Sequence, residues 1–280
     1  MQFKTLSVIG VGLIGAAIGL AAKRRKVAGR VVGADTDAVR LQKALERGAI
    51  DESFTESRLA VAKADVVVFC IPVDRIAEEA VAAAKSSSSA ALFTDAGSTK
   101  SRIVSAVEGR LSNDISFVGA HPLAGSEKQG PEHAHAQLFE GRTTIITRTA
   151  KTPTHALARA QDFWEGLGTR VVVMTPEQHD QTVAFTSHIP HLAAVALAGI
   201  LPSGAGAFAA SGIRDVTRIA SGDPALWTAI FCHNRDNVLT AIRQLIERLS
   251  QMQETMQSSD WPRLLAILDQ AKKVRDALGN

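Results

Sequence analysis

Residues 6–22 form a nearly unbroken apolar stretch that contains closely spaced glycines. Gly10, Gly12 and Gly15 follow the pattern GxGxxG, with a β-branched run before them and a helix-like run after them. In that context the first glycine permits a tight turn, the second lets a pyrophosphate approach the backbone, and the third lets a helix pack on a strand. The alternative is a glycine turn in another kind of α/β fold. We interpret the stretch as the start of a dinucleotide-binding domain.

An acidic residue lies at the position that this interpretation requires. Asp35 closes the second β-rich run, 20 residues after Gly15. Its carboxylate would accept hydrogen bonds from ribose hydroxyls and repel a 2′-phosphate, so we expect NAD rather than NADP. A signal peptide would carry its basic residues before the apolar stretch, whereas here the basic run 23–26 follows it. The predicted cofactor-binding residues are Gly10, Gly12, Leu13, Ile14, Gly15, Asp35, Ile71 and Pro72.

The first 175 residues alternate β-rich runs with helix-like segments. Several of the β-rich runs are apolar throughout, which is typical of strands covered on both faces of a parallel sheet. We expect strands at 6–11, 30–35, 65–71, 91–97, 115–121, 143–148 and 169–175, and helices at 13–26, 37–48, 74–85, 99–111 and 154–167. The alternation predicts the α/β class, with a Rossmann-type, doubly wound sheet in residues 1–175.

After Pro176 the β-branched runs stop, and residues 177–200 and 224–278 have helical patterns. One apolar stripe recurs at steps of three and four residues and consists of Val238, Ile242, Leu245, Leu249, Met252 and Met256. Such a stripe must cover either the core of its own domain or a second subunit. We therefore expect residues 176–280 to form an all-helical C-terminal domain.

The composition excludes some classes of function. The 280 residues are 46% hydrophobic and 21% charged, as in soluble globular proteins, and the net charge is only +3. With 5% aromatic residues and a single basic run, nucleic acid is not expected as a partner, and neither is a membrane. Two distant cysteines, Cys70 and Cys232, make no disulfide framework, so we expect a cytoplasmic protein. His133 and His135 have a generic spacing, and no metal is expected there.

Two polar residues follow strands on the edge where a doubly wound sheet binds its ligands. Ser98 comes after the run 91–97, and His121 ends the run 115–121. Each has a structural alternative, since Ser98 could cap a helix and His121 could belong to a turn. Further on, Arg214 and Arg218 are four residues apart on a predicted helix. They suit carboxylate recognition, although a solvated pair of ion pairs is the alternative.

Five motifs in this order resemble the prephenate/arogenate dehydrogenase family of tyrosine biosynthesis: GVGLIG, DAGSTK, HPLAGSEKQG, SHIPH and GIRDVTRIASGDP. The resemblance covers nearly the whole chain. It implies a Rossmann domain followed by a helical dimerisation domain, and hence a homodimer. It also implies that His121 is the catalytic histidine, that Ser98 is its hydrogen-bond partner, and that Arg218 binds a substrate carboxylate. The substrate-binding residues that we predict from it are Arg218, Arg214, His191, Ser126, Glu127 and Gln129.

The implied reaction fits these residues. Prephenate would lose a hydride from C4 to NAD and CO2 from C1, and its ring would become aromatic. A neutral imidazole near its ordinary pKa of about 6.5 suits the 4-hydroxyl proton, and arginines suit the carboxylates. The reaction needs neither a metal nor a nucleophile. Gln129 is neutral, which favours prephenate over arogenate because an ammonium group would favour an acid there.

Two alternatives belong to other classes. A β-hydroxyacid dehydrogenase would typically use a lysine on a helix, but no lysine occurs between Lys151 and Lys272. A catalytically silent NAD sensor would not need both Ser98 and His121. We therefore expect an NAD-dependent prephenate dehydrogenase, with arogenate or dual cyclohexadienyl dehydrogenase activity as the alternative.

Overall fold

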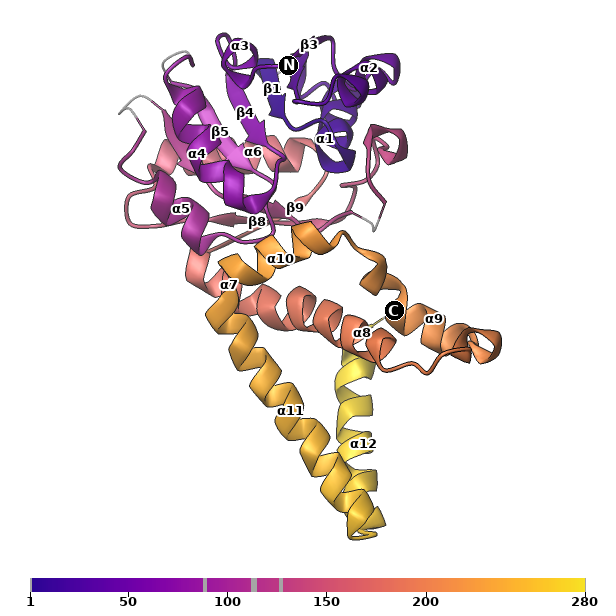
Figure 1. Cartoon of the computed structure of the whole chain (residues 1–280). Coiled ribbons are helices and arrows are strands. Elements are labelled where there is room, and N and C mark those ends of the chain that lie inside the picture. Colours follow the sequence, from indigo (N-terminus) through magenta and orange to yellow (C-terminus); the bar gives the residue numbers. More distant parts are fainter. Residues whose placement is uncertain (1, 88–89, 112–114, 126–127, 280) are drawn as a thin grey trace. The chain divides into compact units, whose positions relative to one another are not determined.

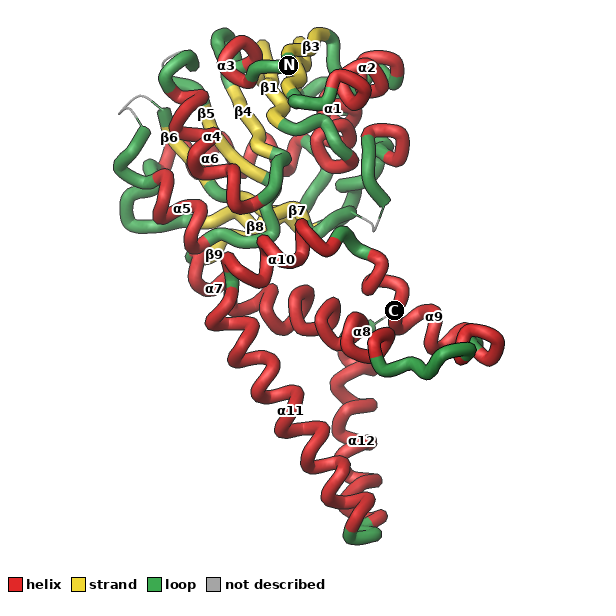
Figure 2. The backbone as a smooth tube through the Cα atoms, viewed as in Figure 1, coloured by secondary structure: helices red, strands yellow, loops and turns green. Residues whose placement is uncertain are grey.

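The computed structural model of the chain describes residues 2–87, 90–111, 115–125 and 128–279 (Figure 1). The chain divides into two compact units, Met1–Asn234 and Arg235–Asn280. The domain boundary predicted after residue 175 lies inside the first unit, directly after the last strand, and it stays a prediction. Within the described ranges, every strand lies before this position and helices and loops follow it. Figure 2 distinguishes the strands in yellow from the helices in red.

A six-stranded parallel sheet forms the centre of the first unit. Its order is β3-β2-β1-β4-β5-β6, so β2 and β3 lie on one side of β1, and β4, β5 and β6 lie on the other side. The strands are β1 (Phe3–Ile9), β2 (Ala28–Ala34), β3 (Glu52–Phe54), β4 (Val66–Phe69), β5 (Leu92–Asp95) and β6 (Ser116–Val118). This order is that of a Rossmann fold and confirms the predicted doubly wound sheet.

Alternating side chains divide the sheet into two apolar faces. In β4, Val66 and Val68 pack on one side with Trp164, whereas Val67 and Phe69 pack on the other side with Ile76. Because successive side chains in a strand point to opposite faces, a strand that is apolar throughout can be buried on both. The helices on the first side are α1 (Leu13–Arg24), α2 (Ala38–Glu46) and α6 (Thr154–Gly166); those on the second are α3 (Ser57–Ala60), α4 (Val73–Ala84) and α5 (Ser101–Val107).

The structure corrects two of the strand predictions. β3 was not expected, because its three residues, Glu52–Phe54, lack a β-branched run and pair only with β2. The run 115–121 was expected to be one strand, but it is divided between β6 and β7 (Ala120–Pro122). Gly119 separates them, and a Cβ there would lie 2.6 Å from Oγ1 of Thr147 and 2.9 Å from Cγ2 of Val104. Glycine therefore lets Thr147 and Val104 pack closely against the backbone where the chain passes from the first sheet to the second.

β7 belongs to a second, three-stranded sheet with β8 (Thr143–Thr147) and β9 (Arg170–Met174). β7 pairs with β8 in the antiparallel direction, and β8 pairs with β9 in the parallel direction. The register places His121 opposite Ile145. This small sheet carries the predicted catalytic histidine.

Residues 177–200 are helical, as their pattern predicts, but they do not form one regular α-helix. α7 (Pro176–Val183) is followed by a π-helical turn, Ala184–His188, and then by α8 (Ile189–Gly199). Pro190 has no N–H to donate, and its ring crowds the carbonyl group four residues earlier, so the helix widens before it. By length and composition this run could cross a membrane, but core helices meet the same criterion, and here His179, Asp180 and His188 are buried in protein.

The helical pattern over residues 224–278 is confirmed, and it consists of three helices. α10 (Pro224–His233) ends the first unit, after α9 (Ser211–Thr217). α11 (Arg235–Gln257) and α12 (Trp261–Ala277) form the second unit and pack against each other as a hairpin. Between them Ser259 has a φ of +55°, and Asp260 caps α12 by accepting from the N–H of Arg263 at 3.1 Å. A positive φ at this point is incompatible with a continuous helix.

Candidate active site

The glycine turn joins β1 to α1 at the carboxyl edge of the sheet. Gly10 has a φ of +92°, and its N–H donates to the carbonyl oxygen of Ala34 at 2.7 Å. A Cβ at Gly10 would overlap the backbone of Cys70, and a Cβ at Gly15 would overlap the carbonyl oxygen of Gly10. Side chains are therefore excluded at both positions by backbone contacts, as the motif requires.

The second glycine differs because it faces open space. A Cβ on Gly12 would meet no atom within 4 Å. Gly12 is the N-cap of α1 and provides no side-chain cap, so the N–H groups of Leu13 and Ile14 in the first turn have no side-chain partner there. Free N–H groups at the positive end of a helix bind phosphate well. The residues present thus fit the pyrophosphate of a dinucleotide.

Asp35 lies directly after β2, with its side chain nearly buried. Its carboxylate oxygens accept from the N–H of Val11 at 3.1 Å and from the N–H of Asp37 at 2.9 Å. Arg40 of α2 approaches it at 3.9 Å. These contacts fix the carboxylate beside the glycine turn, where ribose hydroxyls would be recognised. Ile71 and Pro72 lie between β4 and α4 on the same edge, and Ile71 contacts the Gly10 position.

His121 is anchored to the central sheet through its neighbour in β7. The N–H of Ala120 donates to Oδ1 of Asp95, at the end of β5, at 3.0 Å. The other carboxylate oxygen of Asp95 accepts from the N–H of Gly97 at 2.9 Å and pairs with Nζ of Lys100. Both Asp95 and Lys100 are fully buried. A buried pair of this kind holds β7 against the carboxyl end of β5.

The ring of His121 has a partner that the sequence analysis missed. Its Nδ1 lies 2.9 Å from Nε2 of His179, and Nδ1 of His179 lies 2.8 Å from Oδ1 of Asp180. His179 and Asp180 come from α7 and are buried. The adjacent His-Asp pair near the start of a predicted helix was the available signal, but nothing in the sequence relates it to a residue 58 positions earlier.

Burial lowers the pKa of His121 well below 6.5, and the neighbouring His179, Lys100 and His188 lower it further. Burial also lowers the pKa of His179, against the opposing effect of Asp180. Desolvation disfavours a charged imidazolium, so both rings are neutral at pH 7. A neutral imidazole is able to accept a proton, as a general base must.

Ser98 lies half-buried in the loop between β5 and α5, on the same edge as His121. It is not the N-cap of α5, because Lys100 occupies that position. The hydrogen-bond partner of His121 at Nδ1 is His179 rather than Ser98. The role of Ser98 toward the other ring nitrogen stays a prediction.

His191 is buried on α8, and its ring stacks on that of Trp227 from α10 at a centroid distance of 3.5 Å. Its Nδ1 is buried and has no hydrogen-bond partner among the described residues. An unsatisfied buried polar atom is unusual in a native protein and is a candidate contact for a bound ligand. Trp227 was not predicted as a site residue, because an isolated tryptophan in a helix normally indicates a core position.

The arginines lie around the junction of α9 with the 3-10 turn Arg218–Ser221, which packs against α8. Both are exposed, and Nε of Arg214 donates to the carbonyl oxygen of Ala209 at 3.1 Å. Because the helix tightens at Arg218, the two arginines do not continue one regular α-helical face as expected. Ser126 and Glu127, also predicted to bind substrate, lie outside the described residues.

Gln129 is exposed, and its Nε2 donates to Oδ2 of Asp223 at 3.0 Å. The other oxygen of Asp223 caps α10 by accepting from the N–H groups of Ala225 and Leu226. A neutral side chain at position 129 therefore has a carboxylate beside it. The loop that follows His121 thus reaches α10.

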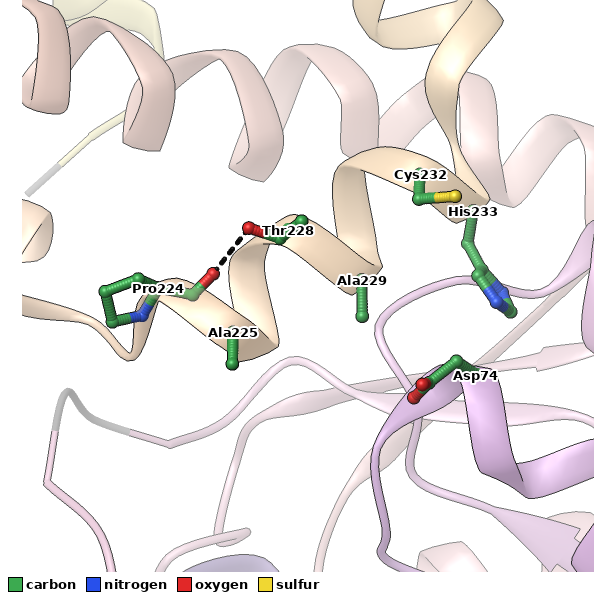
Figure 3. A pocket seen from close by; sticks show the side chains of 7 residues that line it. All are labelled: Asp74, Pro224, Ala225, Thr228, Ala229, Cys232 and His233. Carbon is green, nitrogen blue, oxygen red and sulfur yellow. Dashed lines mark hydrogen bonds between the residues drawn. The ribbon is translucent and has the colours of Figure 1, made fainter.

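A hollow of about 500 Å³ lies between α4 and α10 (Figure 3). Its lining residues are Asp74, Pro224, Ala225, Thr228, Ala229, Cys232 and His233. It contains none of the predicted site residues, and the hydroxyl of Thr228 is occupied by the carbonyl oxygen of Pro224 at 2.7 Å. Within the described ranges, no group of three or more His, Cys, Asp or Glu residues is placed to hold a metal ion.

Two family models match the chain in succession. The nucleotide-binding domain of prephenate dehydrogenase matches residues 18–185, and the dimerization domain of prephenate dehydrogenase matches residues 175–270. The first match begins after the glycine turn, so the geometry at residues 10–15 supports nucleotide binding independently of it.

Individual relatives match nearly the whole of this chain. Prephenate dehydrogenase of Bacillus subtilis is 33% identical over 98% of this chain and 76% of that protein. Cyclohexadienyl dehydrogenase of Zymomonas mobilis is 32% identical over 99% of this chain and 96% of that protein. A crystal structure of prephenate dehydrogenase from Aquifex aeolicus, in complex with hydroxyphenyl propionate and NAD+, superposes with a TM-score of 0.92 at 31% identity and covers 99% of both chains. From the two domain matches and these full-length similarities, the chain belongs to the prephenate dehydrogenase family and is an NAD-dependent dehydrogenase.

Proposed function

We propose that the protein catalyses the NAD-dependent oxidative decarboxylation of prephenate to 4-hydroxyphenylpyruvate. The observation that carries this proposal is the buried, neutral His121, held by His179 at the edge of the sheet that also bears the glycine turn. A base at this edge lies on the side of the fold where a hydride acceptor binds. The kinship with a prephenate dehydrogenase that binds NAD+ and hydroxyphenyl propionate supports the same reaction.

The cofactor-binding residues and His121 have separate roles in this reaction. Gly10 and Gly15 allow the close backbone contacts of the turn, Gly12 leaves room for the pyrophosphate, and Asp35 binds the ribose hydroxyls. NAD supplies the hydride acceptor when bound. His121 takes the proton of the substrate's 4-hydroxyl group as C4 is oxidised.

The substrate carboxylates need cations and donors. The planar guanidinium of Arg218 can grip a carboxylate with two parallel hydrogen bonds, and Arg214 lies one helical turn before it. The unsatisfied Nδ1 of His191, buried against Trp227, offers a further polar contact. Loss of CO2 makes the ring aromatic, so the protein mainly has to orient the substrate against the cofactor.

Arogenate is the second candidate substrate, and one observation favours it. Gln129 is neutral, which favours the keto group of prephenate, but its amide donates to Asp223 and so brings a carboxylate to the same place. A carboxylate would attract the ammonium group that arogenate carries in place of the keto group. The similarity to a cyclohexadienyl dehydrogenase is compatible with a dual activity.

The proposed function is tested by steady-state kinetics with prephenate and arogenate, each with NAD and NADP, monitored by formation of the reduced nicotinamide. We expect kcat/KM to be highest for prephenate with NAD. A higher kcat/KM for arogenate would identify arogenate as the preferred substrate. No oxidation of either substrate would refute both.

The role of His121 predicts the effect of His121→Asn. Removing the base should lower kcat by a factor of about 10² to 10⁴, the usual contribution of general acid–base catalysis. The Kd for NAD, measured by fluorescence titration, should stay within about threefold, because the glycine turn and Asp35 are untouched. Near-normal kcat in a correctly folded variant would exclude this role.

The role of Arg218 predicts a different pattern. Arg218→Ala should mainly raise KM for prephenate, by about tenfold or more, because a charge-assisted contact to the carboxylate is lost. Arg218→Lys should recover only part of the affinity, since an ammonium group cannot make two parallel hydrogen bonds. An unchanged KM for the Ala variant would contradict the assignment.

We also infer that the protein is a homodimer formed through its helical regions. Large apolar side chains are exposed on α8, α11 and α12, among them Val195, Leu249, Met256 and Leu265. Exposed apolar residues repeated along helices mark a surface for a partner, and the matching dimerization domain supports a second copy. Analytical ultracentrifugation should give twice the chain mass of 29.7 kDa, and a monomer at micromolar concentration would refute the inference.

A further inference from the structure

Three buried groups form a hydrogen-bonded series behind the proposed base. His121 Nδ1 contacts His179 Nε2 at 2.9 Å, and His179 Nδ1 contacts Asp180 Oδ1 at 2.8 Å. His179 is fully buried, Asp180 is 1% exposed, and His121 is 9% exposed. Because water has little access to them, the three nitrogens that join the series find their partners within the protein.

Asp180 is held in one orientation by backbone donors. Its Oδ1 also accepts from the N–H of Lys100 at 2.7 Å, and its Oδ2 accepts from the N–H of Ser101 at 2.9 Å. The carbonyl oxygen of Asp180 accepts from Nδ2 of Asn234 at 2.7 Å. Burial raises the pKa of Asp180, but the hydrogen bonds from His179, Ser101 and Lys100 outweigh it and hold the pKa below its usual range. Asp180 is therefore an ionised acceptor.

The ionised carboxylate of Asp180 determines which nitrogen of each histidine ring carries the hydrogen. An ionised carboxylate has no proton to donate, so Nδ1 of His179 carries the hydrogen in that contact. In a neutral ring the other nitrogen is then an acceptor, so Nε2 of His179 receives a hydrogen from Nδ1 of His121. His121 consequently has its lone pair at Nε2, the nitrogen that His179 does not occupy.

We propose that His179 and Asp180 are positioning residues that hold His121 in the Nδ1–H tautomer and so make Nε2 the proton acceptor. The proposal rests on the assigned role of His121 and deepens it. In serine hydrolases a buried carboxylate orients the catalytic histidine directly. Here a second histidine, His179, lies between the carboxylate of Asp180 and His121.

Hydride loss from C4 is accompanied by transfer of the 4-hydroxyl proton to His121. As the C4–H bond breaks and its electron pair leaves as hydride, the O–H bond of the 4-hydroxyl breaks and a bond from that proton to Nε2 of His121 forms. The O–H electrons become the second bond of the C4 carbonyl group. While the proton is on Nε2, Nδ1–H stays bonded to His179, whose contact with Asp180 stabilises the positive charge. The bond from C1 to its carboxylate then breaks, its electrons complete the aromatic ring, the second bond of the C4 carbonyl returns to the oxygen as a lone pair, and that oxygen takes the proton back from Nε2.

The test compares two substitutions of the middle residue. The amide oxygen introduced by His179→Gln can still accept from Nδ1 of His121, whereas His179→Leu offers no acceptor. We expect the Gln variant to keep kcat for prephenate within about tenfold of the wild type. We expect the Leu variant to lose about 10²-fold or more in kcat, with KM and the Kd for NAD within about threefold. His155→Gln, an exposed histidine on α6, is the control and should change nothing.

A spectroscopic readout separates positioning from packing. In protein labelled with 15N-histidine, NMR distinguishes the protonated from the unprotonated ring nitrogen, and the signals that disappear in His121→Asn belong to that residue. We expect Nδ1–H in the wild type and the Gln variant, and a shift toward Nε2–H in the Leu variant. A packing role would instead favour leucine in this buried site, so equal kcat and an unchanged tautomer in the Leu variant would overturn the proposal.

The pH profile gives a third readout through Asp180→Asn, which keeps an acceptor oxygen but removes the charge. The charged and titratable groups around the two rings are Asp95 of β5, Lys100 before α5, Asp180 of α7 and His188 of the π-helical turn. In the wild type kcat/KM should fall only below pH 6.5, since the pKa of His121 is lowered and protonation removes the base. Loss of the negative charge lowers that pKa further, so the acid limb should move to lower pH, and an unmoved limb would count against the proposal.

The proposed reaction and the positioning role of His179 are tested by different measurements. The NMR measurement needs no substrate. Failure of the wild-type protein to oxidise prephenate or arogenate would refute the proposed function, whereas an unaltered tautomer in His179→Leu would refute the positioning role alone.

Discussion

The buried carboxylate of Asp95 is the interaction on which the site depends. It stands at the end of β5 in the central sheet, pairs with Lys100, and accepts the N–H of Ala120 in the second sheet. A buried charge is costly unless it is paired and hydrogen-bonded, so this arrangement has few alternatives. The strand that carries His121 is thereby fixed to the edge where the glycine turn lies.

The carboxylate of Asp180 connects α7 to the start of α5 in a similar way. Asp180 accepts the backbone N–H groups of Lys100 and Ser101 at the start of α5, and its own carbonyl oxygen accepts from Asn234 at the end of α10. One side chain thus joins α7 to the Rossmann domain while it orients His179. If His121 is the base, as we propose, the hydrogen bonds that join these elements also orient it, because a base that is rigidly held must be attached to rigid elements.

Local patterns account for what could be predicted. The turn at Gly10–Gly15 and the acid at Asp35 lie at spacings set by one strand–helix–strand unit, so the dinucleotide-binding fold was predictable, and both the fold class and the family are confirmed. The roles of His121, Ser98 and Arg218 remain proposals. The strand predicted over residues 115–121 was wrong at Gly119, where the chain passes from the first sheet to the second.

The sequence by itself predicted the order of the elements and the cofactor edge, because a strand–helix–strand unit and its glycine turn depend on neighbours within about 30 residues. His121 was the candidate base because it ends a predicted strand and because five motifs along the chain resemble one family. The nitrogen that we propose as the proton acceptor could be chosen only from the tertiary structure, in which Nδ1 of that histidine contacts His179. That choice depends on His179 and Asp180, which lie far along the chain and reach the ring only when α7 packs under the second sheet. A hydrogen bond between distant residues leaves no periodicity in a single sequence, whereas a buried polar atom in the folded chain must have its partner.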